Sequence, residues 1–251
     1  MHEIVDALAA QHDELGAILA DLDDAAWAMP SRCDGWTVSD VVLHLAQTDE
    51  MASASLAGRF GEHLDEIARS WGTAADVDEG AAAMVAAERG PTASEVHERW
   101  RASAAELRRL LANHDPSRRV PWVVGDLAAR TLATTRLAEA WIHTGDVATA
   151  FGPLPPPTDR LRFIARLAWR TLPYAFERAG RTMAGPVAFE LIGPAGEAWR
   201  FAPDEPAATV IRGSAHELCL VAGQRTAASD TGLQGEGPDA DAVLELVRTF
   251  A

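Results

Sequence analysis

Lysine is absent from this sequence, since all 22 basic residues are arginine. Without a lysine amine the chain cannot form a Schiff base, build a phosphate loop around a lysine or pair a serine with one. Cysteine is scarce: Cys33 and Cys219 lie far apart and outside any Cys-x-x-Cys motif. A disulfide framework and a cysteine zinc site are therefore not expected. We interpret both cysteines as small buried or half-buried structural residues, not as thiols placed beside a base.

Long apolar runs and clusters of positive charge are missing as well. No stretch approaches about eighteen uncharged apolar residues, so no membrane span is expected. The N-terminus, Met-His-Glu-Ile-Val-Asp, lacks the basic start and apolar run of a signal peptide, which favours a cytoplasmic protein. The net charge of −15 repels phosphate backbones, and the basic residues cluster no further than Arg108-Arg109 and Arg118-Arg119. We therefore expect no nucleic-acid partner.

Two motifs are also absent, one typical of hydrolases and one typical of dinucleotide-binding proteins. The sequence contains neither a Gly-x-Ser-x-Gly elbow nor a Gly-x-Gly-x-x-Gly phosphate loop. Hydrolase triads of the elbow type and dinucleotide binding therefore have no support.

The first half of the sequence has the apolar periodicity of long helices. The segment Thr37-Val-Ser-Asp40 is typical of a capping box, in which both side chains satisfy free amide groups at a helix start. The stretch 70–93 is less periodic and is predicted to be a connection that contains a short helix. Four long helices are predicted. The first covers about residues 2–22, the second runs from the capping box to about residue 57, and the other two cover about 94–112 and 125–150.

The run Gly152-Pro-Leu-Pro-Pro-Pro157 marks a domain boundary, because proline cannot continue a helix. We predict a helical domain over residues 1–153 and a second domain over 158–251. In the second domain, a turn-rich link at Gly193-Pro-Ala-Gly196 suits a hairpin. The predicted elements there are a helix over 158–180, strands over 187–192, 198–201 and 208–211, and helices over 214–222 and 238–250. The expected fold class is α+β, a four-helix bundle followed by a small α/β domain.

The fourth predicted helix carries three ionisable residues on one face. Glu139, His143 and Asp146 stand at positions i, i+4 and i+7, and the adjacent Ala138 and Ile142 indicate that this face points into the bundle. Such a stripe is costly unless its members pair or bind a metal ion. An exposed Glu139–His143 pair is the alternative interpretation.

The second predicted helix offers a further ligand, His44, which lies among Val41, Val42, Leu43 and Leu45. One interpretation of His44 is a buried neutral histidine bonded to a backbone carbonyl group. The other is a metal ligand. Because an open zinc site needs three protein ligands, His44 would complete a two-histidine, one-carboxylate set with Glu139 and His143.

These residues carry a family resemblance. The motifs of the first half are Gly35-Trp36-Thr37-Val38 leading to His44-Leu45, and Glu139-x-x-x-His143-x-x-Asp146. They resemble the DinB-like metal-binding bundle and, more closely, the mycothiol-dependent maleylpyruvate isomerase family. The second half resembles the family's C-terminal domain, which is related to sterol-carrier proteins. Its motifs are Gly-Pro-x-Gly-x-x-Trp at 193–199, Gly213-Ser-Ala-His-Glu-Leu218 and Ala222-Gly-Gln-Arg225.

The resemblance implies that His44, Glu139 and His143 are the ligands of one divalent metal ion, with zinc as the expected ion. It also implies that a low-molecular-weight thiol such as mycothiol is a co-substrate at the open metal position. The expected activity is then transfer to, or isomerisation of, a small electrophilic substrate. Two alternatives remain: a metal-dependent hydrolase that works through metal-bound water, and a non-catalytic protein that binds metal or a small ligand.

Asp146 has three candidate roles: a fourth ligand, a carboxylate that orients a ligand histidine from outside, or a helix-end carboxylate in solvent. We favour the orienting role, because metal-bound histidines usually donate their other ring nitrogen to such a group. The remaining histidines stand in polar or charged surroundings and are interpreted as surface residues, at positions 2, 12, 63, 97, 114 and 216.

Overall fold

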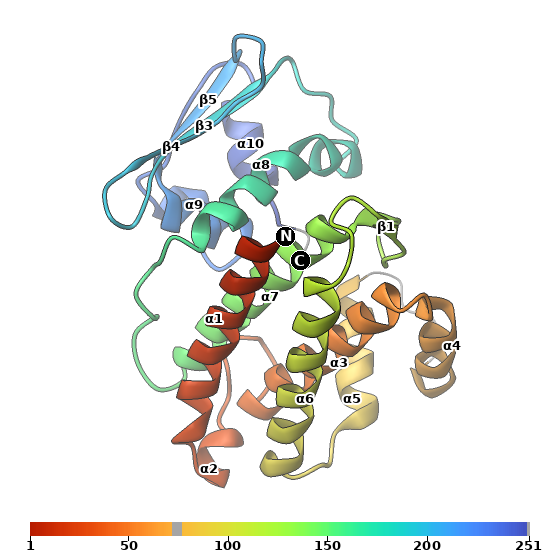
Figure 1. The fold of residues 1–251 in the computed structure, drawn as a ribbon. Coiled ribbons are helices and arrows are strands. Elements are labelled where there is room, and N and C mark those ends of the chain that lie inside the picture. Colours follow the sequence, from red (N-terminus) through yellow and green to blue (C-terminus); the bar gives the residue numbers. More distant parts are fainter. Residues whose placement is uncertain (72–76, 250–251) are drawn as a thin grey trace. The chain divides into compact units, whose positions relative to one another are not determined.

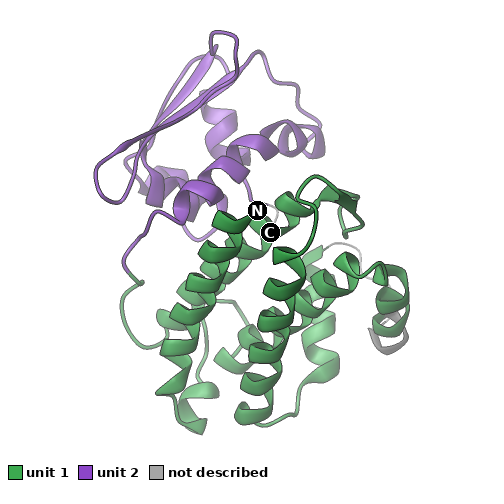
Figure 2. Ribbon diagram, in the orientation of Figure 1, with its two compact units in different colours: residues 1–155 green, residues 156–251 purple. Residues whose placement is uncertain are grey.

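The computed structural model describes residues 1–71 and 77–249. The chain divides into two compact units, Met1–Pro155 and Pro156–Ala251, and the division falls within the proline run (Figure 2). Figure 1 shows the helices of the first unit and the mixed helices and strands of the second. The α+β fold class is confirmed. No helix of the described residues is both long enough and apolar enough to cross a membrane.

Four long helices form the bundle of the first unit: α1 (His2–Ala20), α3 (Val38–Leu56), α6 (Ala93–Ala112) and α7 (Ala129–Ala148). Both α3 and α1 pack against α6 and α7 (Figure 1). The shorter elements are α2 (Asp24–Trp27), α4 (Phe60–Trp71), α5 (Val77–Glu88) and the two-residue strands β1 (Arg119–Val120) and β2 (Leu127–Ala128).

Capping boxes determine where two of these helices begin. At the start of α3, Thr37 Oγ1 accepts a hydrogen bond from the Asp40 amide at 3.2 Å, and Asp40 Oδ2 accepts one from the Thr37 amide at 2.9 Å. This capping box was predicted from the sequence. The box that begins α6, formed by Thr92 and Glu95, was not predicted. Both boxes satisfy amide groups that a helix start leaves free.

Two sequence predictions in the first unit need correction. The fourth helix begins at Ala129 and not at residue 125, because Leu127–Ala128 pairs with Arg119–Val120 as a short antiparallel ribbon. The amphipathic helix α4 was not predicted at all. It contributes Phe60, Leu64 and Ile67 to a small apolar cluster with Met51 and Met84.

The short helix expected within 70–93 corresponds to α5. Residues 72–76 of that stretch, and residue 250 of the last predicted helix, lie outside the described residues.

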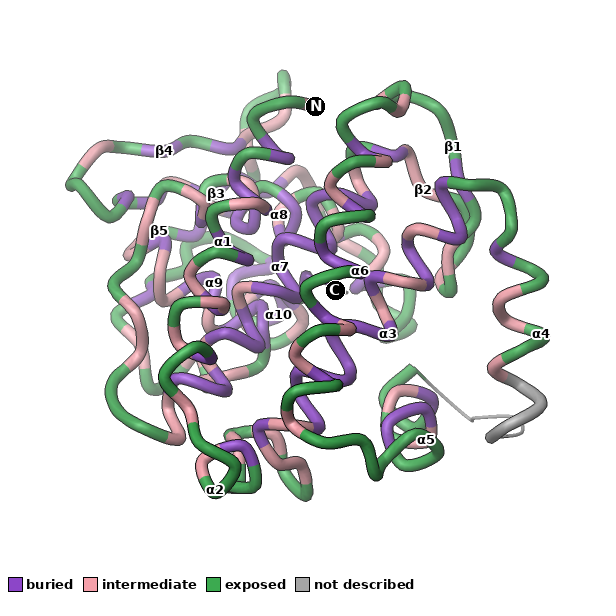
Figure 3. The backbone as a smooth tube through the Cα atoms, turned by 60° about the horizontal axis from the view of Figure 1, so that its bottom comes forward, coloured by how far each residue is buried: buried purple, intermediate pink, exposed green. Residues whose placement is uncertain are grey.

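The two helices that carry the candidate ligands are the most deeply buried of the bundle. Most residues of α7 and of α3 are buried, whereas α1 and α6 expose one face (Figure 3). Polar groups on α3 and α7 are therefore removed from water, and each must find a partner inside the bundle.

The second unit packs helices against a four-stranded mixed sheet with strand order β4-β3-β5-β6. Strand β3 pairs antiparallel with β4 and parallel with β5, which pairs antiparallel with β6. The elements in chain order are α8 (Leu161–Arg178), β3 (Val187–Ile192), β4 (Ala198–Phe201), β5 (Thr209–Ser214), α9 (Ala215–Ala222), the 3₁₀ turn η1 (Ala228–Asp230), β6 (Gln234–Glu236) and α10 (Ala240–Leu246).

An ion-pair ladder crosses all four strands of this sheet. Glu190 on β3 pairs with Arg200 on β4 and with Arg212 on β5, and Arg212 also pairs with Glu236 on β6. The predicted hairpin and third strand are present, but β6 was not predicted. Its three exposed residues have no apolar alternation, so its pairing with β5 leaves no pattern in the sequence.

Candidate functional site

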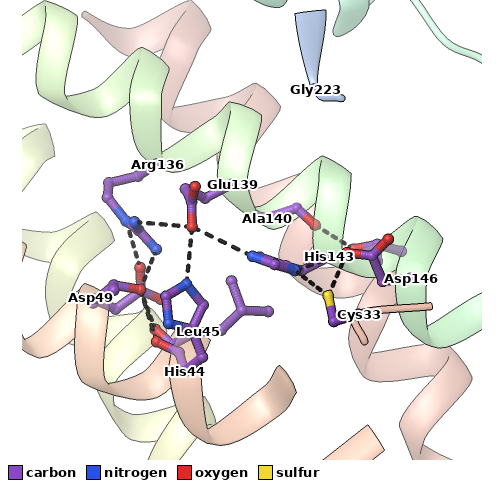
Figure 4. Close-up of polar contacts among 12 residues, drawn as sticks. Cys33, His44, Leu45, Asp49, Arg136, Glu139, Ala140, His143, Asp146 and Gly223 are labelled. Atoms are coloured by element: carbon purple, nitrogen blue, oxygen red, sulfur yellow. Dashed lines mark hydrogen bonds and ion pairs between the residues drawn. The ribbon is translucent and has the colours of Figure 1, made fainter. Parts of the chain in front are cut away.

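The three predicted metal ligands meet in the core of the bundle, where α3 supplies His44 and α7 supplies Glu139 and His143 (Figure 4). Their exposed fractions are 6%, 7% and 8%. Glu139 Oε2 lies 3.2 Å from His44 Nε2 and 3.6 Å from His143 Nε2. One ligand atom from each residue lies within 4.8 Å of the other two. These side chains therefore converge on one place.

The donor set fits a divalent transition-metal ion. Two imidazole nitrogens and one carboxylate oxygen are typical of open zinc sites, in which a further position is left for an exchangeable group. The carboxylate oxygen faces the Nε2 atoms of both rings, as a common cation would require. In addition, His44 Nδ1 is buried and has no hydrogen-bond partner among the described residues. Nδ1 of His44 therefore makes no hydrogen bond to a backbone carbonyl group of the described chain, and the Nε2 atom faces the Glu139 carboxylate at 3.2 Å.

The protonation states of the three residues depend on one another. Burial lowers the pKa of His44 in spite of the nearby Glu139. Burial by itself would raise the pKa of Glu139, but hydrogen bonds and charges from His143 and His44 hold that pKa well below its usual value. Burial by itself would lower the pKa of His143, but contacts with Asp146, Cys33 and Glu139 outweigh this effect and raise that pKa. A neutral His44 and an ionised Glu139 are the forms that bind a metal ion.

Asp146 contacts the ring nitrogen of His143 that faces away from the other ligands. His143 Nδ1 lies 2.9 Å from Asp146 Oδ2, and Asp146 is fully buried. The Nδ1 hydrogen therefore has a partner, which leaves Nε2 directed at Glu139. This contact has the geometry of the predicted orienting role.

We expect Asp146→Asn to weaken metal binding by about 10- to 100-fold without abolishing it, because an amide holds the His143 ring less strongly than a carboxylate. The measurement is a competition titration of the metal-free protein with a chromophoric chelator. Asp126→Asn, in the connection before α7, is the control. An unchanged affinity in Asp146→Asn would show that Asp146 has no part in the metal centre.

Cys33 is half-buried, as the sequence analysis expected, but its contacts with two residues of the candidate site were not expected. Its Sγ lies 3.1 Å from Asp146 Oδ2 and 3.7 Å from His143 Nδ1 (Figure 4). Sequence spacing could not predict a contact between residues more than a hundred positions apart. Cys219 agrees with the interpretation: it is buried in the second unit, where burial raises the pKa of its thiol.

The loop before α3 forms one wall of the site. It closes on itself through a bridge between Pro30 and Thr37, and Gly35 adopts a φ of +73°, which favours glycine. The ring of Trp36 lies 5.2 Å from the ring of His44, measured between centroids. The Arg89 side chain donates to the Gly35 carbonyl at 3.3 Å and so ties the loop to the end of α5.

Arg136, which the sequence analysis missed, lies behind Glu139 in the core. Its exposed fraction is 2%, its Nε donates to Asp49 Oδ1 at 3.1 Å, and its Nη2 donates to Thr48 Oγ1 at 2.8 Å. Its Nη1 lies 3.9 Å from Glu139 Oε2. The signal that could have revealed it is an arginine three positions before Glu139, on the same buried face.

His12 is not the surface residue that we expected. It is 3% exposed, its Nδ1 accepts a hydrogen bond from Arg108 at 2.8 Å, and its Nε2 lies 3.9 Å from Asp49 Oδ2. Burial, aided by Arg108 and Arg136, lowers the pKa of His12 to about 3, so it is neutral near pH 7. Burial raises the pKa of Asp49 to about 6. The other five histidines outside the ligand set are exposed or half-exposed.

Comparisons with known proteins agree with the resemblance seen in the motifs. Residues 8–148 match the family model of the mycothiol maleylpyruvate isomerase N-terminal domain. Uncharacterised proteins from two strains of Mycobacterium tuberculosis are 34% identical to the chain over 245 residues, which are 97% of this chain and 93% of each relative.

The same fold occurs in crystal structures of the mycothiol-dependent maleylpyruvate isomerase and of a histidine-to-alanine mutant of it. Their TM-scores are 0.61 and 0.60 at 17% and 18% identity, with 95% of each chain covered. Family membership places the chain among enzymes. Because the family model covers more than half of the chain, the protein belongs to the mycothiol maleylpyruvate isomerase family.

Proposed function

We propose that this protein is a divalent-metal-dependent enzyme that uses a low-molecular-weight thiol, mycothiol or a thiol of its kind, to transfer to or isomerise a small electrophilic substrate. The observation that carries the proposal is the convergence of His44, Glu139 and His143 in the core of the bundle. The family supports the thiol, since mycothiol is part of its name.

His44, Glu139 and His143 would hold the ion, with zinc as the expected one. When bound, such an ion supplies positive charge that lowers the pKa of a small thiol and favours the thiolate. The protein contributes the environment. Burial keeps His44 neutral, Asp146 holds the His143 ring with Nε2 toward the site, and Trp36 covers part of the His44 ring.

The chain's own cysteines do not supply this thiol. Cys33 Sγ lies on the Nδ1 side of His143, whereas the converging ligand atoms lie on the Nε2 side. Its contact at 3.1 Å is with the Asp146 carboxylate. Cys219 is buried in the second unit, and burial raises the pKa of its thiol. The reactive sulfur therefore comes from a small molecule.

Turnover is expected to require an added thiol. Maleylpyruvate, the substrate named in the solved structures, is the first electrophile to assay, with and without mycothiol. We expect no measurable turnover without thiol. In the cobalt-substituted protein, mycothiol should produce a sulfur-to-cobalt charge-transfer absorption that glycols and amines do not produce. Cys219→Ser is the control and should keep its activity.

A hydrolase, in which water takes the place of the thiol, is the alternative function. If turnover persists without any thiol and the cobalt spectrum does not respond to sulfur, the hydrolase becomes the better account of the site.

A further inference from the structure

We propose that Cys33 is a positioning residue of the metal centre: its thiol holds the Asp146 carboxylate in the orientation in which that carboxylate aligns His143. This inference rests on the proposed metal site at His44, Glu139 and His143. It assigns a role to a residue that lies outside the ligand set and on a different segment of the chain.

Two donors meet on a single carboxylate oxygen. Asp146 Oδ2 lies 2.9 Å from His143 Nδ1 and 3.1 Å from Cys33 Sγ (Figure 4). Asp146 is fully buried, so water does not compete for this oxygen. Rotation of the carboxylate would break both hydrogen bonds at once. A carboxylate held from two directions keeps a narrower range of orientations than one held by His143 alone.

The geometry assigns the thiol to hydrogen bonding and not to nucleophilic attack. An activated cysteine and its carboxylate partner contact opposite nitrogens of a histidine ring, so that one nitrogen takes the thiol proton while the other is held. Here Cys33 and Asp146 both face Nδ1 of His143. The single Nδ1 hydrogen points to the nearer atom, Asp146 Oδ2, and the thiol donates its own hydrogen to the same oxygen.

Backbone contacts hold Cys33 in this place. The Cys33 amide donates to Ser31 Oγ at 3.1 Å, and the Ser31 amide donates to the Trp36 carbonyl at 2.9 Å. The Arg32 amide donates to the Asp146 carbonyl at 3.2 Å. The loop therefore contacts Asp146 twice, through its backbone and through the thiol.

The test measures metal affinity in Cys33→Ala and Cys33→Ser by chelator competition. We expect Cys33→Ala to bind cobalt or zinc about tenfold more weakly, at the lower end of the range for groups that support a ligand from outside. Cys33→Ser should recover part of this loss, because a hydroxyl group can donate to the same oxygen. The cobalt d–d spectrum should change in the alanine variant and move back toward the wild-type spectrum in the serine variant.

Two controls separate positioning from a general loss of structure. Thr149→Val removes a hydroxyl group at the same end of α7 that donates to the backbone carbonyls of Gly145 and Asp146. It should leave metal affinity unchanged. The second control is a double-mutant cycle: in an Asp146→Asn background, Cys33→Ala should cause little further loss, because the residue through which it acts has already been altered.

The outcomes distinguish this inference from the proposed function. Wild-type affinity in both Cys33 variants, or an undiminished effect of Cys33→Ala in the Asp146→Asn background, would overturn the positioning role and leave the metal centre intact. If the wild-type protein itself binds no divalent ion, the proposed function and this inference both fail. If metal-free Cys33→Ala is unfolded, Cys33→Ser takes its place. Its metal affinity is then compared with that of the wild type, and the double-mutant cycle is made with Cys33→Ser and Asp146→Asn.

Discussion

His44→Ala and His143→Ala should each abolish stoichiometric metal binding, whereas the wild-type protein should carry about one divalent ion per chain. Removing either ring leaves two protein ligands, one fewer than an open zinc site requires. The loss of affinity should exceed the roughly 100-fold that a supporting group outside the ligand set accounts for. Elemental analysis of the purified proteins gives the stoichiometry, and chelator competition gives the affinity.

His2→Ala is a matched control for these variants, since His2 is an exposed histidine at the start of α1. It should retain the full complement of metal. Full retention in both His44→Ala and His143→Ala would instead show that the site lies elsewhere. If the two variants lose their fold together with the metal, the ion is structural, because its binding free energy has become folding free energy. Circular dichroism of the metal-free wild type separates these cases.

Arg136→Met should lower the free energy of unfolding by about 3–5 kcal/mol, the range for breaking one partner of a buried ion pair. Arg136 and Asp49 are 2% and 1% exposed, so the variant leaves the Asp49 carboxylate without its cation and without water. The energy is lost because a buried charge stays unpaired. Urea unfolding of the metal-free proteins at pH 7 measures it.

The deficit of Arg136→Met should shrink as the pH falls from 7 to 5. The pKa of Asp49 in the folded wild-type protein is raised from 3.8 to about 6, first by burial, and loss of Arg136 removes a group that opposes this rise. Between these two values the folded state binds more protons than the unfolded state, so stability increases as the pH falls. Protonation removes the unpaired charge that makes the substitution costly.

Asp49→Asn combined with Arg136→Met is the decisive control, because it removes both charges of the pair. This double variant should be more stable at pH 7 than Arg136→Met alone. An equal loss in both would mean that packing, and not an unpaired charge, causes the destabilisation. Arg109→Met removes an exposed arginine of α6 that pairs with Glu106, and it should have little effect.

Local patterns were enough to predict much of the bundle and to single out the residues that converge in its core. Helix periodicity and the Thr37–Asp40 capping box involve residues within one or two turns of each other, so the sequence alone indicates them. The same holds for Glu139 and His143, which share a face because they are four positions apart on one helix. The proline run likewise marked the region where the two units divide.

Among the elements that the sequence analysis missed are α4 and β6, each of which forms against other elements of the fold. Helix α4 has an amphipathic pattern, and its apolar face packs against Met51 and Met84. Strand β6 is exposed at every residue and exists because β5 offers an unpaired edge. The local sequence of β6 does not differ from that of a loop, whereas the i, i+4, i+7 spacing of Phe60, Leu64 and Ile67 is a helical signal that the sequence analysis did not use.

What the sequence determined by itself is therefore the four long helices of the bundle and the region in which the two units divide, and it singled out His44, Glu139 and His143 as the residues that we propose as metal ligands. Only the tertiary structure decided which groups support those residues. Cys33 reaches Asp146, and Asp49 reaches Arg136, across 113 and 87 positions of the chain. The physical reason is that burial makes an unpaired polar group costly, but the partner that satisfies it is chosen by the packing of helices and loops and not by spacing along the chain.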